Sequence, residues 1–250
     1  MAFANDDLEP VFTEKVEFAY VDLLAFEDPL AHWLTNLGRA VNDLLLGNRR
    51  LARDLAEAPA EEDSAASHEV IYDIKAVSAD AWELAKFLRE SGEVPEVAEF
   101  IEKRMPKKAR LDYQRAMDAF GPAGDGSPKE KAFKELLGSA RDQSRHYSKI
   151  NHKLIKRALR RLEKDAEGEP NRGIVLCGGT FKDFYAPFAA EVDWQLFHAI
   201  EGEELEPLQA FSDWLNTVVA YLIRFSTTAF HCYLRDREDE TEVTELAGQS

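Results

Sequence analysis

The chain has 250 residues, of which 45% are hydrophobic and 31% charged, and its net charge is −16 at pH 7. This balance predicts a globular protein with a buried core, in one large domain or two small ones, and it argues against a disordered chain. No apolar run approaches the roughly 18 residues that cross a bilayer, and the first residues lack the basic start and apolar core of a signal peptide. We therefore expect no membrane span and a cytoplasmic protein.

The N-terminal half predicts a series of amphipathic helices, because apolar residues recur there at three- and four-residue steps. The predicted helices cover residues 30–57, 68–91, 95–104 and 106–120. An acidic, small-residue connection follows the first helix, Gly92 ends the second, and Pro106 suits the first turn of the fourth. A loop rich in glycine and proline, residues 121–128, then separates these helices from the centre of the chain.

The longest predicted helix runs from residue 128 to residue 166, and one seam of side chains follows it. The seam consists of Phe133, Leu137, Ala140, Ser144, Tyr147, Asn151, Leu154 and Ala158. Such a seam packs against neighbouring helices, but Ser144 and Asn151 place polar groups in its middle. We therefore expect residues 128–164 to form the interface of a two-fold dimer, in which this polar interruption lies beside charged residues.

The pattern changes in the C-terminal third. Residues 173–185 predict a β-hairpin around a two-glycine turn, and the alternating segment 191–198 is a candidate third strand. An amphipathic helix resumes over residues 203–235, and residues 236–250 suggest a frayed acidic tail. The sequence thus predicts a mostly α fold in one domain, residues 1–250. Its helical bundle core covers residues 30–235, and a small β-hairpin or meander at 173–199 is inserted before the last long helix.

A basic segment lies inside this acidic chain. Residues 103–164, the basic window, contain 18 Lys and Arg against 7 Asp and Glu, a balance of +11, whereas residues 1–102 carry −15 and residues 165–250 carry −12. So sharp a reversal suggests an anionic partner, with nucleic acid bound through this segment rather than the whole surface. The alternative is a solvated basic helix face whose charges pair with the acidic flanks, which is the usual arrangement of exposed charges.

The sequence predicts neither a cofactor nor a metal site. It contains no phosphate- or dinucleotide-binding glycine motif, no Gly-x-Ser-x-Gly, and no Glu-x-x-His or Cys-x-x-Cys. Cys177 and Cys232 lie in apolar contexts, so we expect buried, reduced thiols. Among the histidines, only His146 and His152 have cationic neighbours, which should depress the pKa of the imidazole and keep it neutral, the form that accepts a proton.

The spacing of these residues restricts how they can form a site. On a straight helix Arg141, Arg145 and His152 fall within roughly 40° of one another, whereas Arg141 and His146 are about 140° apart. A site that uses Arg141 with His146 therefore needs a break in the helix, or a second copy of the helix brought across a symmetric dimer.

The segment Arg141-Asp142-Gln143-Ser144-Arg145-His146 resembles the signature of the HEPN superfamily (higher eukaryotes and prokaryotes nucleotide-binding). That motif is an Arg, then a polar residue, then three to five further residues and a His, on a helix of an all-helical bundle. Asp142 suits the second position, and Arg145 with His152 offers an alternative register. The order of the predicted helices also resembles the family in outline, but the residues between Asp142 and His146 are polar where family members usually carry aliphatic ones.

The resemblance implies a metal-independent endoribonuclease of toxin or phage-defence type that works as a dimer. His146 would activate the ribose 2′-OH or protonate the leaving 5′-oxygen, and Arg141 would stabilise the charge that develops on the phosphorus oxygens. Asp142 would orient the Arg or the His. The residues expected to contact RNA are Arg145, Tyr147, Lys149, His152, Lys153 and Arg157.

Two hypotheses of different classes follow. The first is a HEPN-like RNA-binding protein that cleaves RNA as a homodimer, with a cognate antitoxin as a further partner. Other HEPN members have lost catalysis and bind only nucleotides or partners. The second hypothesis is a non-catalytic helical interaction protein, whose basic helix docks an acidic protein partner.

Overall fold

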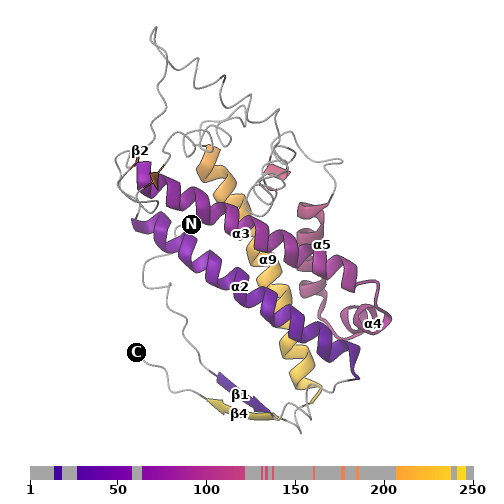
Figure 1. The fold of residues 1–250 in the computed structure, drawn as a ribbon. Coiled ribbons are helices and arrows are strands. Elements are labelled where there is room, and N and C mark those ends of the chain that lie inside the picture. Colours follow the sequence, from indigo (N-terminus) through magenta and orange to yellow (C-terminus); the bar gives the residue numbers. More distant parts are fainter. Residues whose placement is uncertain are drawn as a thin grey trace. The chain divides into compact units, whose positions relative to one another are not determined.

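A computed structural model describes three long stretches of the chain, residues 27–57, 64–121 and 207–237 (Figure 1). It also describes strands at 14–18 and 241–245, short strands at 176–177 and 184–185, and the isolated positions 131, 133, 134, 137 and 160. Most of these residues are helical, which confirms the predicted mostly α class.

Five helices lie within the described stretches: α2 (Pro29–Glu57), α3 (Ser64–Ser91), α4 (Pro95–Lys103), α5 (Lys107–Phe120) and α9 (Pro207–Arg235). All five coincide with predicted helices, and each begins within four residues of the predicted start. The helix predicted over 128–166 is helical at its five described positions, and the rest of it lies outside the described residues. None of the five described helices is long and apolar enough to cross a membrane.

The chain divides into two compact units. Unit 1 contains residues 1–52, 80–120 and 217–250, and unit 2 contains residues 53–79 and 121–216. Helices α2, α3 and α9 each contribute residues to both units. The single domain expected over the whole chain stays a prediction.

In unit 1 the helix ends follow from the local sequence. Asp28 caps α2, because its Oδ1 accepts the backbone N–H of Leu30 at 2.9 Å and its carbonyl accepts that of His32 at 3.1 Å. Pro95 opens α4, where its missing N–H and fixed φ cost nothing. At the other end of α4, the N–H of Arg104 donates to the carbonyl of Phe100. These local signals explain why sequence periodicity located the helices closely.

The apolar faces of the helices form the core of unit 1. Its largest fully buried side chains are Leu34, Leu37, Leu44, Leu51, Leu84, Leu88, Phe225 and Tyr233. The Trp33 ring meets Phe100 edge-on, with centroids 5.9 Å apart, and its indole N–H donates to Ser91 Oγ at 2.9 Å. Gly38 allows close approach to α9, because a Cβ at this position would lie 3.1 Å from Cζ of Phe230.

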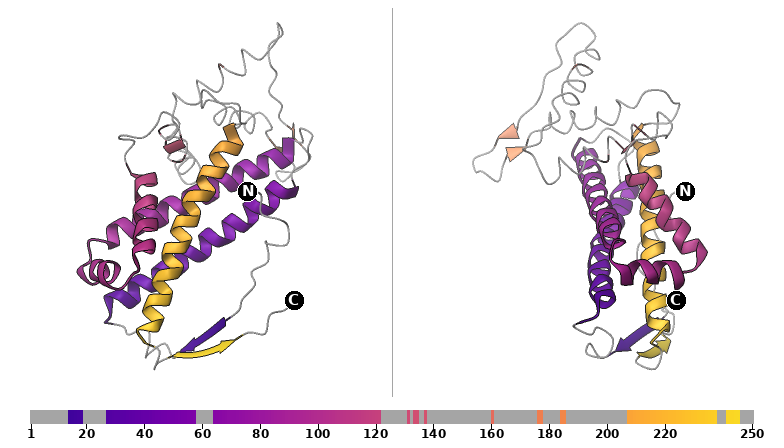
Figure 2. Two further views of the ribbon diagram at one scale, coloured as in Figure 1. Left: turned by 180° about the vertical axis from the view of Figure 1, so that it is seen from behind. Right: turned by 90° about the vertical axis from the view of Figure 1, so that its right-hand side faces the viewer.

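Helices α5 and α9 run antiparallel within unit 1, as the left-hand view of Figure 2 shows. Asp112 of α5 pairs with Arg224 of α9, and Arg115 reaches Tyr221, one turn in the opposite direction along α9. The rings of Tyr113 on α5 and Phe225 on α9 also contact each other, with centroids 5.1 Å apart. An apolar contact therefore fixes the two helices, and a charged pair lies beside it.

Unit 2 contains an aromatic cluster. The rings of Phe133, Phe211 and Trp214 lie 5.5–5.9 Å from one another, so a residue of the predicted 128–166 helix packs against the first turns of α9. The buried apolar residues contributed by this unit's part of α3 are Val70, Ile71, Ile74, Val77 and Ala79. The Phe133 position of the predicted seam is therefore buried, as a packing helix requires.

The strand β1 (Glu14–Phe18) pairs antiparallel with β4 (Thr241–Glu245), with Val16 opposite Val243. The frayed tail predicted for residues 236–250 is therefore wrong at 241–245. Alternating β-branched residues, Thr241 and Val243, suit a strand once a partner is present. That partner comes from the opposite end of the chain, which a local pattern does not show.

Unit 2 contains a second, shorter pairing. Strand β2 (Leu176–Cys177) pairs antiparallel with β3 (Phe184–Tyr185), inside the segment for which a hairpin is predicted. Each of these strands has only two residues, which is shorter than the predicted hairpin. The candidate third strand at 191–198 lies outside the described residues. The β-hairpin or meander stays a prediction.

Candidate functional site

The predicted catalytic residues Arg141, Asp142 and His146 lie outside the described residues. The same is true of the predicted RNA contacts Arg145, Tyr147, Lys149, His152, Lys153 and Arg157. The structure therefore leaves the distance between Arg141 and His146, and the choice between their register and that of Arg145 with His152, as predictions. The dimer interface predicted over 128–164 also stays a prediction.

The N-terminal part of the basic window is described up to residue 121, and its cations divide into two groups. Lys103 pairs with Glu99, with Nζ and Oε1 2.8 Å apart, and Arg104 Nη1 lies 3.6 Å from Asp236 Oδ2. Both acids lie outside the window, so these two pairs match the reading in which basic residues pair with acidic flanks. The second group consists of the cations of α5, and one of them, Arg115, lies near Asp112 and Tyr221 within unit 1.

An Asp–Arg pair joins α5 to α9 within unit 1. Asp112 accepts two hydrogen bonds from Arg224, from Nε to Oδ2 at 3.1 Å and from Nη2 to Oδ1 at 3.3 Å. The Asp112 side chain is only 4% exposed, whereas that of Arg224 is 47% exposed. The pair thus consists of a buried carboxylate and a cation that reaches the solvent.

Two further side chains complete the Arg224 cluster, which we define as Asp112, Arg115, Tyr221 and Arg224. The guanidinium carbons of Arg224 and Arg115 lie over the Tyr221 ring, 5.1 and 5.5 Å from its centroid. Arg115 also approaches Asp112 to 3.9 Å, with 58% of its side chain exposed. One buried carboxylate and one ring therefore orient two exposed cations, because both the ion pair and the cation–π contact restrict their side chains.

Within the cluster, the ion pair with Asp112 shifts the pKa of Arg224. The hydrogen bond that Arg224 donates to Asp112 raises the pKa of Arg224 above its ordinary value, more than burial lowers it. Next to the cluster, burial raises the pKa of Tyr113, and the neighbouring charge of Arg89 opposes that shift. Tyr113 is then a neutral phenol at pH 7, and its hydroxyl donates to the carbonyl of Leu88 at 3.4 Å.

The cluster has a counterpart at the far end of α9, the Asp28 cluster of Asp28, Tyr233 and Arg237. Arg237 Nη2 donates to Asp28 Oδ2 at 3.4 Å, and its guanidinium lies 3.7 Å from the centroid of the Tyr233 ring. The Tyr233 hydroxyl donates to the same Oδ2 at 3.5 Å. Since Asp28 also caps α2, this second cluster fastens the end of α9 to the start of α2.

The other titratable groups of the described residues form neither a metal site nor a reactive thiol. Among the described residues no group of three or more His, Cys, Asp and Glu could hold a metal ion. Cys232 is the buried free thiol that the sequence predicts, and burial raises its pKa, so it stays protonated near pH 7. His32 and His231 are exposed.

Sequence reasoning did not identify the Arg224 cluster, although one signal was present. Between Asp213 and Arg235, Arg224 is the only Asp, Glu, Lys or Arg. A lone charge in so apolar a helix indicates a partner on a neighbouring helix. Asp112 could not be named as that partner, because its contact with Arg224 spans 112 positions of sequence.

Comparisons of the chain with protein-family models, with curated proteins and with solved structures find no match.

Proposed function

We propose that the protein is a HEPN-like RNA-binding protein that cleaves RNA without a metal ion and acts as a homodimer. The observation that carries the proposal is the Arg141-Asp142-x-x-x-His146 motif at the centre of a +11 window in a −16 chain. The mostly helical fold supports it, because HEPN motifs are carried by helical bundles. Phe133 supports it too, since its burial is what a packed motif helix requires.

In the proposed mechanism His146 takes the proton of the ribose 2′-OH or donates one to the leaving 5′-oxygen, and water carries the other proton. The 2′-oxygen attacks the neighbouring phosphorus, and the bond to the 5′-oxygen breaks, which leaves a 2′,3′-cyclic phosphate and a free 5′-hydroxyl. Arg141 stabilises the charge on the phosphorus oxygens. Since Arg141 and His146 lie on different sides of a straight helix, the dimer supplies one of them from each copy.

Cleavage of a labelled single-stranded RNA tests this mechanism. His146→Ala should slow cleavage by about 10²–10⁴-fold, the range for loss of one proton-transfer group. Arg141→Ala should also abolish detectable cleavage, and EDTA should leave the unmutated protein active. His152→Ala is the matched control, because it removes a histidine of the same helix. Activity that is lost only with His152→Ala would assign the site to Arg145 and His152 instead, and loss with EDTA would contradict the mechanism.

Binding can be tested apart from cleavage. Replacement of Lys153, Arg157 and Arg161 by Glu should weaken RNA binding and flatten its dependence on salt, because fewer counterions are released from the phosphates. Immeasurable RNA affinity of the unmutated protein at low salt would refute the RNA-binding function at its first step. A solution mass of one chain at low concentration would refute the dimer.

One observation favours the second hypothesis, a non-catalytic interaction protein whose basic helix docks an acidic partner. Lys103 and Arg104 of the basic window already pair with acids outside it. Basic residues further along could pair in the same way with an acidic protein. Retained partner binding in a His146→Ala variant, with no cleavage by the unmutated protein, would support this hypothesis.

A further inference from the structure

The surface formed by α5 and α9 in unit 1 is basic, although the chain is acidic. We name it the α5–α9 basic face and define it by Lys108, Leu111, Arg115, Tyr221, Arg224 and Arg235. On α5, Lys108, Leu111 and Arg115 fall within about 60° of one another, and on α9, Tyr221, Arg224 and Arg235 do the same. Tyr221 is half-buried, and the other five are exposed.

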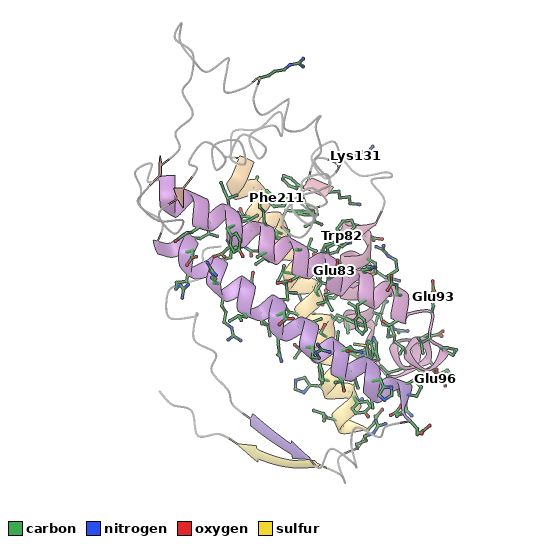
Figure 3. All side chains as sticks on the ribbon, in the orientation of Figure 1. Trp82, Glu83, Glu93, Glu96, Lys131 and Phe211 are labelled. Atoms are coloured by element: carbon green, nitrogen blue, oxygen red, sulfur yellow. The ribbon has the colours of Figure 1, made fainter. Side chains whose placement is uncertain are left out.

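The acids of unit 1 are largely segregated from this face. The exposed glutamates of α3, α4 and the turn between them are Glu83, Glu90, Glu93, Glu96, Glu99 and Glu102, three of which are labelled in Figure 3. Between Thr217 and Leu234, α9 carries no acidic residue at all. On α5 itself, Asp112 is buried beneath Arg224, and the exposed Asp118 lies within about 20° of Leu111 around the helix, so it is the one exposed α5 acid at this face. Asp236, next to Arg235, pairs with Arg104.

Arg224 can bind a second anion while it stays paired with the Asp112 carboxylate. Its bonds to Asp112 use Nε and one N–H of Nη2, which is two of the five N–H donors of a guanidinium. With 47% of the side chain exposed, the other donors can reach a ligand in the solvent. Because Asp112 and Tyr221 already restrict the side chain, little conformational entropy remains to be lost on binding.

Flat and apolar groups interleave with these cations. The Tyr221 ring is half-buried between Arg115 and Arg224, and Leu111 is 41% exposed on the same side of α5 as Lys108 and Arg115. Unstacked bases bind to aromatic rings and guanidinium planes, whereas phosphates bind to Lys and Arg. Tyr221 and Arg235 are also about 21 Å apart along the helix, long enough to follow several nucleotides.

We propose that the α5–α9 basic face binds single-stranded RNA, with Arg115, Arg224 and Lys108 on phosphates and Tyr221 and Leu111 against bases. The identity of the ligand rests on the proposed RNA function. None of the residues that define the face belongs to the motif at 141–146, so the face would hold the strand rather than cut it. An acidic peptide would match the charge but would have no bases to place against Tyr221 and Leu111.

The experiment measures binding of a short fluorescent 2′-O-methyl oligouridine, which lacks the 2′-OH needed for cleavage. Arg115→Gln and Lys108→Gln should each weaken binding by about eightfold at about 50 mM salt and reduce the salt slope by about 0.7, the value for one phosphate contact to a single strand. Arg39→Gln on α2 is the matched control, because it removes one exposed charge of unit 1 away from the face. The RNA affinity of the Arg39→Gln variant should equal that of the unmutated protein.

Asp112→Asn separates preorganisation from simple charge. It makes the protein more positive by one charge, so simple electrostatics predicts tighter binding. Loss of the carboxylate that holds Arg224 predicts weaker binding instead, by about threefold, since Arg224 must then be ordered at the moment of binding. Tighter binding by a folded Asp112→Asn variant would overturn the role of Arg224 as a preorganised contact.

The outcomes distinguish this inference from the proposed function. If Arg115→Gln and Lys108→Gln bind as Arg39→Gln does, while replacing Lys153, Arg157 and Arg161 by Glu lowers affinity, the face is refuted and the RNA function stands. If the unmutated protein binds no oligouridine at low salt, both are refuted. Poly-glutamate that binds the face at least as tightly as oligouridine would overturn RNA as the ligand and indicate an acidic protein partner.

Discussion

The two Asp–Arg–Tyr clusters of unit 1 contain the same residue types but differ in how they expose their charged partners. In the Arg224 cluster the Asp112 side chain is 4% exposed and the Arg224 side chain 47%, whereas Asp28 and Arg237 are almost equally exposed, at 28% and 27%. Asp112 receives two hydrogen bonds from Arg224, whereas Asp28 is bonded by a backbone N–H and a tyrosine hydroxyl in addition to its arginine.

This difference shows that composition does not decide what such a cluster does. Asp28 lies at a helix start, so its carboxylate serves the backbone first and the arginine second. Asp112 lies in the middle of α5, where all nearby backbone groups are already bonded, so its charge acts on arginines only. The Asp28 cluster therefore fastens two chain segments, and the Arg224 cluster presents cations to the solvent.

The largest expected effect is on the free energy of unfolding of Arg224→Ala. This change leaves the buried Asp112 carboxylate without its bidentate partner, and we expect a loss of about 3 kcal/mol. Arg237→Ala should cost less than about 1 kcal/mol, because Asp28 keeps two other donors and partial solvation. Urea denaturation of both variants measures the contrast.

A double-mutant cycle sharpens this contrast. Asp112→Ala combined with Arg224→Ala should be less destabilised than the sum of the single variants, because the orphaned carboxylate is gone. Equal costs for Arg224→Ala and Arg237→Ala would break the distinction between the two clusters.

An intermediate effect is expected for Asp28→Ala, which removes the cap of α2 together with the bonds to Tyr233 and Arg237. Loss of a helix cap costs about 1–2 kcal/mol. Asp28→Ser is the matched control, since a serine hydroxyl can still accept the Leu30 N–H and should recover most of the loss. If Asp28→Ser is as unstable as Asp28→Ala, the fastening role lies in the arginine and tyrosine bonds and not in the cap.

The smallest effect on stability is expected for Arg115→Gln. The Arg115 side chain is 58% exposed and lies 3.9 Å from Asp112, so its pairing should contribute less than about 0.5 kcal/mol. Thermal melting should therefore be nearly unchanged in the variant that tests RNA binding. A large drop in melting temperature would show that Arg115 acts in folding, and would remove the basis for reading its binding defect as a lost phosphate contact.

The helices could be predicted from sequence because their signals are local. Three- and four-residue apolar steps, Pro95 and the cap at Asp28 all lie within the element that they define. The pairing of β1 with β4 and the contact of Asp112 with Arg224 join residues far apart in the chain, and no local pattern indicates such partners. The motif at 141–146 was read from spacing alone, and its site geometry stays a prediction for the same reason.

The aromatic packing described above makes each unit separately observable by fluorescence. Trp33 in unit 1 is 4% exposed and donates its indole N–H to Ser91, an environment that should give blue-shifted emission. Trp214 in unit 2 lies against Phe133 and Phe211. Two variants that keep only Trp33 or only Trp214 of the chain's four tryptophans would therefore each report on one unit. Coincident unfolding transitions in the two variants would mean that the units lose their structure as one cooperative body.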